Sequence, residues 1–469
     1  MLWTMHVTPD PHREGRWRMF YTGLSRRDQG GIQRLGLAIS EDLFRWRKVE
    51  VNWQDNRGPE DPAPVKKARF ESLRRGCDEL HADYDADSCW PLTADPRYYE
   101  SGLDEGRHWV SFRDPFFYCE GPGHPGYLLA AGRVKEGPVV RRGCVAAMKE
   151  VAPNHFEGRP ALHHPGLYDD IEVPNLLKIE GEYYLIGSIR EDAKIRYWHA
   201  SQIGRPWRSY SDNVLMAKGN YAGRICHDDR GYLVWNFYSA DLSDRQRDNL
   251  MPPPKRVRRL PDGRLKLTTF EAFAPLTRGA VDVGCVRGLR VGASGGGQTQ
   301  QTCVADGDRL LLESEAGFQA FVFGEELGCF EFSASLQLDG PGKCGLVFRL
   351  HPESHDGYYL SLDLMKGVAQ LRTWDTGPDG SGEDMMQFRS LQSGFWHAPH
   401  AGRAAVKLLA FGSYIELSVD GCVLLSLADQ TFRGGLMGVY LESSRLSLSD
   451  VRLHHMESPV QSDEHLTRG

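Results

Sequence analysis

The sequence lacks any long apolar run. Across its 469 residues, no hydrophobic stretch approaches the roughly 18 residues that a membrane-spanning helix needs. Residues 1–4 also lack a basic segment followed by an apolar one, so no signal peptide is visible. We therefore expect no membrane partner and a cytoplasmic location, an expectation that holds if residue 1 is the true start of the chain.

Metal-binding cysteine pairs are missing too. The 10 cysteines are scattered without CxxC pairs or the histidine spacing that is typical of zinc sites. We predict reduced thiols, no metal and no cofactor. Neither sign of charge is in strong excess, since the formal net charge is −7 and the pI is near 6.2. This balance does not favour a nucleic-acid partner, and we interpret the short basic run at residues 255–259 as a solvated strand or loop.

Amphipathic helical periodicity is nearly absent, and a repeated hairpin takes its place. Four segments share a glycine turn next to a run of aromatic and branched residues, and another predicted strand precedes each of them. This pattern is typical of the blades of a β-propeller, with a generic antiparallel sandwich as the alternative. The hairpin segments are residues 16–23, 126–132, 181–188 and 231–238, and the preceding strands are residues 2–8, 114–118, 172–179 and 222–227.

The length of the chain predicts more than one core. The hairpin pattern fades after residue 270, and the glycine-rich residues 292–298 are typical of a flexible linker. Period-two strands separated by turns follow, which indicates a β-sandwich. The predicted all-β organisation is a propeller at residues 1–285 with a long insertion at 51–107, a linker at 286–300, a sandwich at 301–456 and a polar tail at 457–469.

Two carboxylates stand beside prolines where predicted strands begin. They are Asp114 in the sequence Phe-Arg-Asp-Pro-Phe and Glu172 in the sequence Ile-Glu-Val-Pro-Asn. The innermost strands of a propeller start near its central channel, so we expect these carboxylates to converge from equivalent positions in consecutive blades. Two convergent carboxylates suit glycoside hydrolysis, and Arg113 would hold a carboxylate or a sugar hydroxyl. The alternative is that Arg113 and Asp114 form an ion pair between blades and that Glu172 caps a turn.

Other polar and aromatic residues lie near the starts of inner strands. Trp3 opens the first visible blade, and Asn220, Tyr221 and Arg224 open the fourth. An aromatic face stacks on the C–H face of a sugar, while Asn and Arg bind hydroxyls. We therefore predict that these four residues bind substrate, with packing or a turn as the alternative role for each.

Asp169 and Asp170 precede Glu172 closely. Their like charges would favour the protonated form of Glu172, which suits an acid that works near neutrality. This electrostatic effect is a hypothesis.

These residues resemble the motifs of a known family. Arg113-Asp114-Pro115 resembles the Arg-Asp-Pro motif of glycoside hydrolase family 32, the β-fructofuranosidase, invertase and levanase group, which is related to families 43 and 68. Glu172-Val173-Pro174 resembles its Glu-Cys-Pro motif, with Val173 in place of Cys. Residues 19–23 and 37–40 resemble the blade that precedes Arg-Asp-Pro, and residues 345–349 and 414–417 resemble the accessory sandwich.

The resemblance implies a five-bladed propeller, of which about four blades are visible, followed by a sandwich. It implies that Asp114 stabilises the transition state and that Glu172 is the general acid and base. It also implies metal-free hydrolysis of fructosyl or related bonds in a carbohydrate substrate, with retention of configuration.

The chain departs from the family at the nucleophile. That residue is an Asp in an Asn-Asp-Pro-Asn motif on the first blade, and the motif is absent from this sequence. Asp10 precedes a proline but falls in a predicted hairpin turn, which makes it a poor substitute. The nucleophile is therefore unknown, and we expect a truncated reading of a longer enzyme, which would be inactive as written without the blade that carries the nucleophile. The alternatives are a non-catalytic carbohydrate-binding protein and an arabinan- or xylan-type glycosidase.

Overall fold

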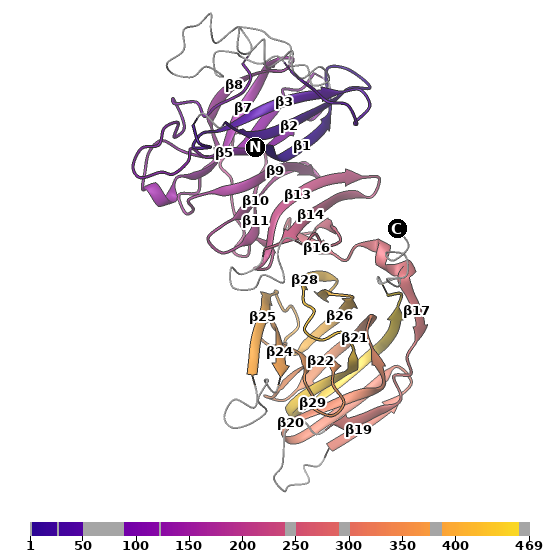
Figure 1. The fold of residues 1–469 in the computed structure, drawn as a ribbon. Helices are drawn as coiled ribbons and strands as arrows, with labels where there is room; N and C mark the ends of the chain where they lie inside the picture. The colour runs from indigo at the N-terminus through magenta and orange to yellow at the C-terminus, as the bar shows by residue number, and fades with distance from the viewer. Residues whose placement is uncertain are drawn as a thin grey trace, which may run out of the picture. The chain divides into compact units, whose positions relative to one another are not determined.

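The computed structural model describes residues 2–25, 28–49, 89–121, 123–239, 250–289, 301–375 and 387–458. These residues form four four-stranded sheets and one sheet of thirteen strands (Figure 1). This arrangement confirms the predicted all-β class, with four propeller blades and a sandwich. The chain divides into two compact units, of which the first contains Met1–Val214 and Ala222–Arg224, and the second contains Leu215–Tyr221 and Ile225–Gly469.

Each blade is an antiparallel sheet whose strands are ordered as they follow one another in the chain. A short 3₁₀ turn, η1 (Val139–Arg141), lies inside the second blade, and another, η3 (Glu271–Leu276), follows the fourth. The first blade contains β1 (Leu2–Pro9), β2 (Trp17–Leu24), β3 (Gln33–Ser40) and β4 (Arg47–Lys48). The second contains β5 (Phe112–Tyr118), β6 (Tyr127–Arg133), β7 (Gly143–Ala152) and β8 (His155–His163). The third contains β9 (Ile171–Ile179), β10 (Glu182–Ile189), β11 (Lys194–Ala200) and β12 (Val214–Met216). The fourth contains β13 (Asn220–Asp228), β14 (Gly231–Tyr238), β15 (Lys255–Arg259) and β16 (Leu265–Thr268).

The first strand of every blade carries one non-glycine residue with a positive φ. These residues are Thr4, Asp114, Val173 and Ala222, with φ values of 44°, 61°, 50° and 53°. In the first three blades the strand pairing also shifts register at this place, as in a β-bulge, which redirects the neighbouring side chains. When the blades are aligned on the residue with positive φ, Asp114 corresponds to Val173, and Arg113 corresponds to Glu172. This corrects the expectation that Asp114 and Glu172 occupy equivalent positions.

Aromatic side chains fill the core between the first two blades. Phe20 and Phe117 stack at 5.5 Å between ring centroids, and Trp90 meets Phe156 edge-on at 5.7 Å. Trp90 and Tyr99 are buried in this core although they belong to the predicted insertion at residues 51–107. The carboxyl-terminal part of that segment is therefore structural, while residues 50–88 lie outside the described residues.

The sandwich begins earlier in the chain than the sequence predicts. β17 (Thr277–Ala280) pairs with β29 (Gly435–Met456), and β18 (Val286–Leu289) pairs with β20 (Arg309–Leu327). Both short strands thus belong to the thirteen-stranded sheet rather than to the propeller or the predicted linker. Residues 290–300 of the linker and residues 459–469 of the tail lie outside the described residues.

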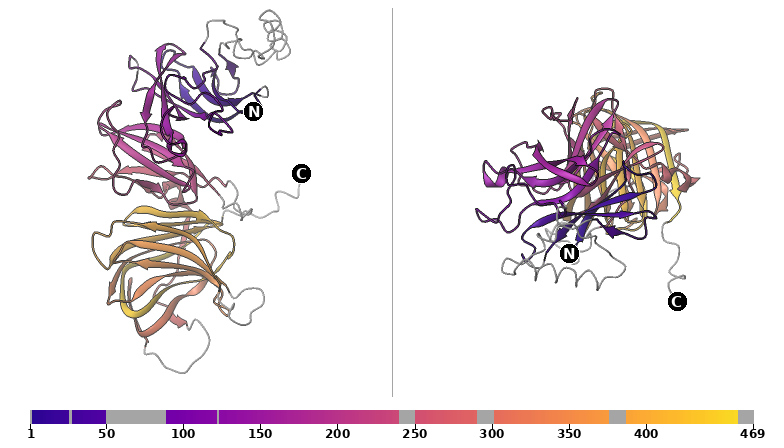
Figure 2. Two further views of the ribbon diagram at one scale, coloured as in Figure 1. Left: turned by 90° about the vertical axis from the view of Figure 1, so that its left-hand side faces the viewer. Right: turned by 90° about the horizontal axis from the view of Figure 1, so that it is seen from above.

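Figure 2 shows the strands of the sandwich from two further sides. Buried apolar side chains from these strands form one large core. The remaining strands of the sandwich are β19 (Gln301–Asp306), β21 (Phe330–Asp339), β22 (Lys343–Leu350), β23 (Gly357–Asp363), β24 (Val368–Asp375), β25 (Gln387–Phe395), β26 (Arg403–Phe411), β27 (Tyr414–Val419) and β28 (Cys422–Ala428). Within the described residues, no helix is long and apolar enough to cross a membrane.

Candidate functional site

Arg113 lies between three carboxylates at the start of β5. Its Nη2 donates a hydrogen bond of 2.7 Å to Glu172 Oε1 and lies 3.3 Å from Asp170 Oδ2. Its Nε lies 3.5 Å from Asp114 Oδ2. Burial alone lowers the pKa of Arg113, but Asp170, Asp114 and Glu172 more than offset burial, so the pKa is raised. A charged guanidinium therefore joins the two carboxylates that the sequence singled out, and contact of Arg113 with a sugar stays a prediction.

Asp114 is fixed by contacts with the blades on either side. Its backbone N–H donates to Thr22 Oγ1 on the first blade at 2.9 Å. Its Oδ2 accepts a hydrogen bond of 3.0 Å from the backbone N–H of Val173 on the third blade. The residue is buried, whereas 15% of the Glu172 side chain is exposed. The two carboxylates thus differ in access to solvent, which favours different chemical roles.

Arg224 holds the backbone that follows each carboxylate. Its Nη2 donates to the carbonyl oxygen of Pro115 at 3.0 Å, and its Nη1 donates to that of Pro174 at 3.4 Å. Burial lowers the pKa of Arg224 to about 10, and the nearby charge of Asp114 opposes this effect. These contacts place Arg224 beside both motifs, and its contact with a sugar stays a prediction.

His6 also lies at this site, and the sequence analysis missed it. Its ring packs on Phe116, with 4.4 Å between the ring centroids. Burial, assisted by the positive charge of Arg224, lowers the pKa of His6 to about 3, so the imidazole is neutral near neutral pH. His6 stands two residues after the bulge, like Phe116 and Arg224 in their own blades. Aligning the blades on the bulge would have identified it.

Trp3 and Tyr221 each precede the bulge of their blade by one residue, as Arg113 and Glu172 do. Trp3 is partly buried. Tyr221 belongs to the second compact unit, where its ring meets Phe237 edge-on at 5.9 Å. Contact of either ring with a sugar stays a prediction.

Asn220 has a structural role that the sequence analysis did not predict. Its side chain is fully buried, and its Nδ2 donates to the carbonyl oxygens of Ala217 at 3.1 Å and Ser426 at 3.0 Å. Its Oδ1 accepts a hydrogen bond from Asn236 Nδ2 at 3.0 Å. Because both ends of the amide are occupied inside the protein, we withdraw Asn220 from the predicted sugar-binding residues.

A ladder of alternating charges leads away from Arg113. Arg133 Nη2 lies 2.7 Å from Asp170 Oδ2 and 3.0 Å from Asp169 Oδ2. Arg107 Nη1 in turn lies 2.7 Å from Asp169 Oδ1, and its Nε lies 3.0 Å from Glu100 Oε2. Asp169 and Asp170 are therefore compensated by arginines. The sequence hypothesis treated Asp169 and Asp170 as charges without partners beside Glu172, and the described structure instead pairs both with arginines.

The ladder continues to the protein surface. Arg142 Nη1 lies 2.9 Å from Glu100 Oε1 and also contacts Glu105, whose side chain is 53% exposed. Glu100, Glu105 and Arg107 come from the segment predicted as an insertion. That segment is thus connected electrostatically to the site as well as to the core.

Asp10 is engaged away from the site. It follows β1 in the hairpin turn, where its Oδ2 lies 2.6 Å from Arg16 Nε and its Oδ1 accepts the N–H of His12 at 2.9 Å. The structure thus agrees with the expectation that Asp10 is a poor nucleophile. Among the residues with described positions, we identify no counterpart of the missing nucleophile, and no cluster of three potential metal ligands is found.

Three solved structures share this arrangement of strands. The exo-inulinase from Aspergillus awamori matches with a TM-score of 0.59 and 13% identity, over 98% of this chain and 84% of that chain. The sucrose-6-phosphate hydrolase from Lactobacillus gasseri matches with a TM-score of 0.54 and 12% identity, over 97% and 91%. The GH32 β-fructofuranosidase from Bombyx mori matches with a TM-score of 0.51 and 14% identity, over 98% and 93%.

The fold is family 32-like. At such low identity the likeness concerns the fold alone. Scans of the sequence against family models and against curated proteins find no significant match.

Proposed function

We propose that this protein is a glycosidase that acts on fructosyl or related glycosidic bonds through Asp114 and Glu172. The observation that carries the proposal is the position of Arg113, which contacts a buried carboxylate from its own blade and a partly exposed one from the next. Fold similarity to fructosyl hydrolases supports the substrate class, which remains part of the proposal.

The environments of the two carboxylates suggest their roles. Glu172 is the partly exposed member and can exchange a proton with solvent, so it is assigned as general acid and base. When Glu172 gives its proton to the leaving oxygen, Arg113 stabilises the resulting carboxylate. Asp114 is buried and held by the N–H of Val173, which suits it to face the positive charge that develops on the sugar. Retention of configuration, which the resemblance implies, requires a nucleophile that is not yet identified.

Replacing Glu172 tests this assignment. We expect Glu172→Gln to lower any hydrolysis of sucrose, inulin or levan by about 10²–10⁴-fold, because the amide cannot transfer the proton. Glu157→Gln, at an exposed residue of β8, is the matched control and should leave the rate unchanged. Equal rates for the wild-type protein and Glu172→Gln would show that the site is assigned wrongly.

A second candidate function is non-catalytic sugar binding. Binding needs no nucleophile, whereas hydrolysis with retention of configuration requires one. Calorimetric titration with fructose and with inulin oligosaccharides, followed by analysis of the products, separates the two functions. A protein that only binds sugar gives a heat signal that saturates and forms no product. Turnover of aryl arabinosides or xylosides, but not of fructosides, would instead support an arabinan- or xylan-type enzyme.

A further inference from the structure

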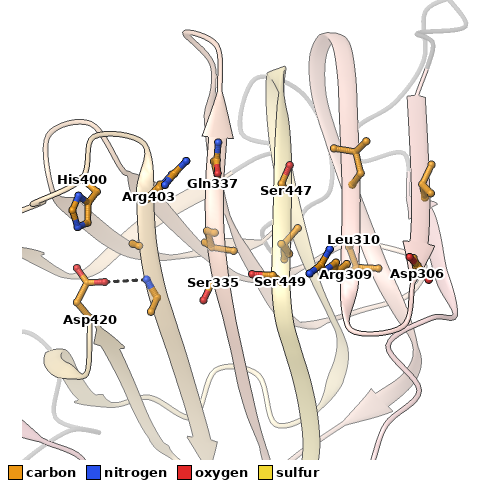
Figure 3. A pocket seen from close by; sticks show the side chains of 16 residues that line it. Asp306, Arg309, Leu310, Ser335, Gln337, His400, Arg403, Asp420, Ser447 and Ser449 are labelled. Atoms are coloured by element: carbon orange, nitrogen blue, oxygen red, sulfur yellow. Dashed lines mark hydrogen bonds between the residues drawn. The ribbon is translucent and has the colours of Figure 1, made fainter.

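A cavity of about 720 Å³, lined by both polar and apolar residues, opens on the large sheet of the sandwich (Figure 3). It crosses five neighbouring strands, β19, β20, β29, β21 and β26. The cavity forms because small residues occupy its floor, where Ser335 pairs with Ala405 on one side and Ser449 on the other. Longer side chains, those of Arg309 and Arg403, stand toward its two ends.

Several hydrogen-bond donors at this cavity are unused. Neither Arg309 nor Arg403 has a hydrogen-bond or ion-pair partner for its guanidinium in the described part of the chain. By contrast, Arg445 on the same sheet lies 2.9 Å from Glu313 Oε1. The hydroxyl of Ser447 on the floor likewise has no protein partner among the described residues. The floor and both ends thus offer donors to a bound molecule.

The charges around the cavity balance one another. Asp306 stands at the end with Arg309, and Asp420 stands at the end with Arg403. One oxygen of Asp420 accepts the N–H of Ala405 at 3.0 Å, which leaves its other oxygen available as an acceptor. An anion would meet carboxylates at both ends, whereas a neutral molecule rich in hydroxyl groups can use donors and acceptors together. The pairing of charges therefore favours a neutral polyhydroxy ligand.

The size and floor of the cavity point to a chain of sugars rather than to a single small polyol. Arg309 and Arg403 lie on strands separated by β29 and β21, so three interstrand spacings of about 4.8 Å place their backbones about 14 Å apart across the sheet. On β19, the strand beyond Arg309, Val304 is 52% exposed and offers an apolar surface for the C–H groups of a sugar ring. We propose that this cavity is a second, non-catalytic site that binds a neutral oligosaccharide.

This inference goes beyond the proposed activity and does not require turnover in the propeller. Its test uses the full chain carrying Glu172→Gln, so that no substrate is consumed. Inulin-type fructo-oligosaccharides, xylo-oligosaccharides and arabino-oligosaccharides are the neutral probes, and oligogalacturonates are the anionic comparison. Calorimetry gives the affinity, and hydrogen exchange read by mass spectrometry locates the bound sugar.

We expect at least one neutral probe to protect the peptides around residues 303–311 and 400–406 from exchange. Arg309→Ala and Arg403→Ala should each weaken that protection at least tenfold, and Ser447→Tyr should abolish it by filling the floor. Arg287→Ala is the matched control, because Arg287 is an exposed arginine of the same sheet that does not line the cavity. Both arginines of the cavity are exposed, so their removal should leave the sandwich folded.

The proposal is overturned if no neutral probe protects these peptides at millimolar concentration. It is also overturned if oligogalacturonates alone protect them, or if the cavity variants bind as the parent does. Protection confined to the propeller peptides would support the proposed active site and contradict the second site. A lack of hydrolysis by the wild-type protein would count against the proposed function only.

Discussion

Buried cationic side chains in this protein differ in the number of acidic or hydrogen-bonding partners that they contact. Arg113 contacts three carboxylates, whereas Lys255 in the second unit is fully buried and its Nζ has no hydrogen-bond partner in the described structure. The Nζ lies 5.4 Å from the centre of the Tyr414 ring. Burial lowers the pKa of Lys255 from 10.5 to about 8, although the charge of Glu416 opposes this effect. Lys255 should therefore make stability depend on pH.

We predict that the free energy of unfolding rises between pH 8 and pH 10. In this range folded Lys255 is mostly deprotonated, whereas the unfolded side chain still binds a proton. Unfolding thus takes up a proton, and its free energy increases by up to about 1.4 kcal/mol per pH unit. Urea denaturation of the wild-type protein and Lys255→Met at several pH values measures this slope. The variant should lose it, and an equal slope in both proteins would contradict the prediction.

At the residue scale, the sequence identified the carboxylates and misjudged their surroundings. Asp114 and Glu172 could be found because each stands beside a proline at the start of a strand. His6 was missed and Asn220 misassigned because their positions depend on the bulge, which is set by backbone φ and by partners distant in the sequence. No local pattern of side chains carries that information.

At the scale of single elements, the repeated bulge is the feature that positions the site. It places Asp114 where it accepts the N–H of Val173, and it does so with non-glycine residues at positive φ. A left-handed conformation costs a non-glycine residue roughly 1–2 kcal/mol. The recurrence of this conformation in all four blades shows that the geometry is maintained against that cost.

Ala222 offers the simplest test of the strain, since its methyl group contributes little packing. We expect Ala222→Gly to stabilise the protein by about 0.5–1 kcal/mol, because glycine adopts φ of 53° without a steric penalty. Ala38→Gly, at a buried residue of β3 where the pairing with β2 shows no register shift, is the control and should destabilise it by a similar amount or more. Thermal and urea denaturation measure both changes. A loss of stability with Ala222→Gly would contradict the idea of strain.

Regular strands could be predicted from the sequence far better than the edges of domains. The blade hairpins are local and carry aromatic residues and glycine turns, so their pattern is visible in the chain. β17 and β18 have four residues each and pair with strands far along the chain, at β29 and β20. Their membership of the sandwich is a long-range property, and for that reason the boundary was predicted too late.

At the scale of the whole molecule, one strand exposes an unusual amount of apolar surface. On β1, Leu2, Met5 and Val7 are 52%, 50% and 43% exposed. The described faces between the first and second blades and between the second and third are, by contrast, filled with buried apolar side chains. Exposed apolar surface of this kind promotes association between molecules.

We predict that the protein associates through β1 as its concentration rises. Met5→Lys combined with Val7→Thr should reduce this association, because the face becomes polar while the strand keeps a β-branched residue. Leu167→Lys is the control, since Leu167 is 62% exposed but lies outside this strand. Sedimentation velocity at several concentrations measures the outcome. If the double variant and the control associate alike, β1 is not the contact.

The ladder of charges offers a way to change the pH dependence of this protein from its surface. It runs without a break from the surface carboxylate of Glu105 to Glu172, through three arginines that each contact two carboxylates and through Arg113, which contacts three. Removing the carboxylate of Glu105 would leave Arg142 with Glu100 as its remaining acidic partner, and this would alter the contact of Glu100 with Arg107 in turn. For the proposed activity, Glu105 and Arg142 are positions where a substitution would alter the pH dependence without changing Asp114 or Glu172, and a library at these two positions, screened at two pH values, tests this.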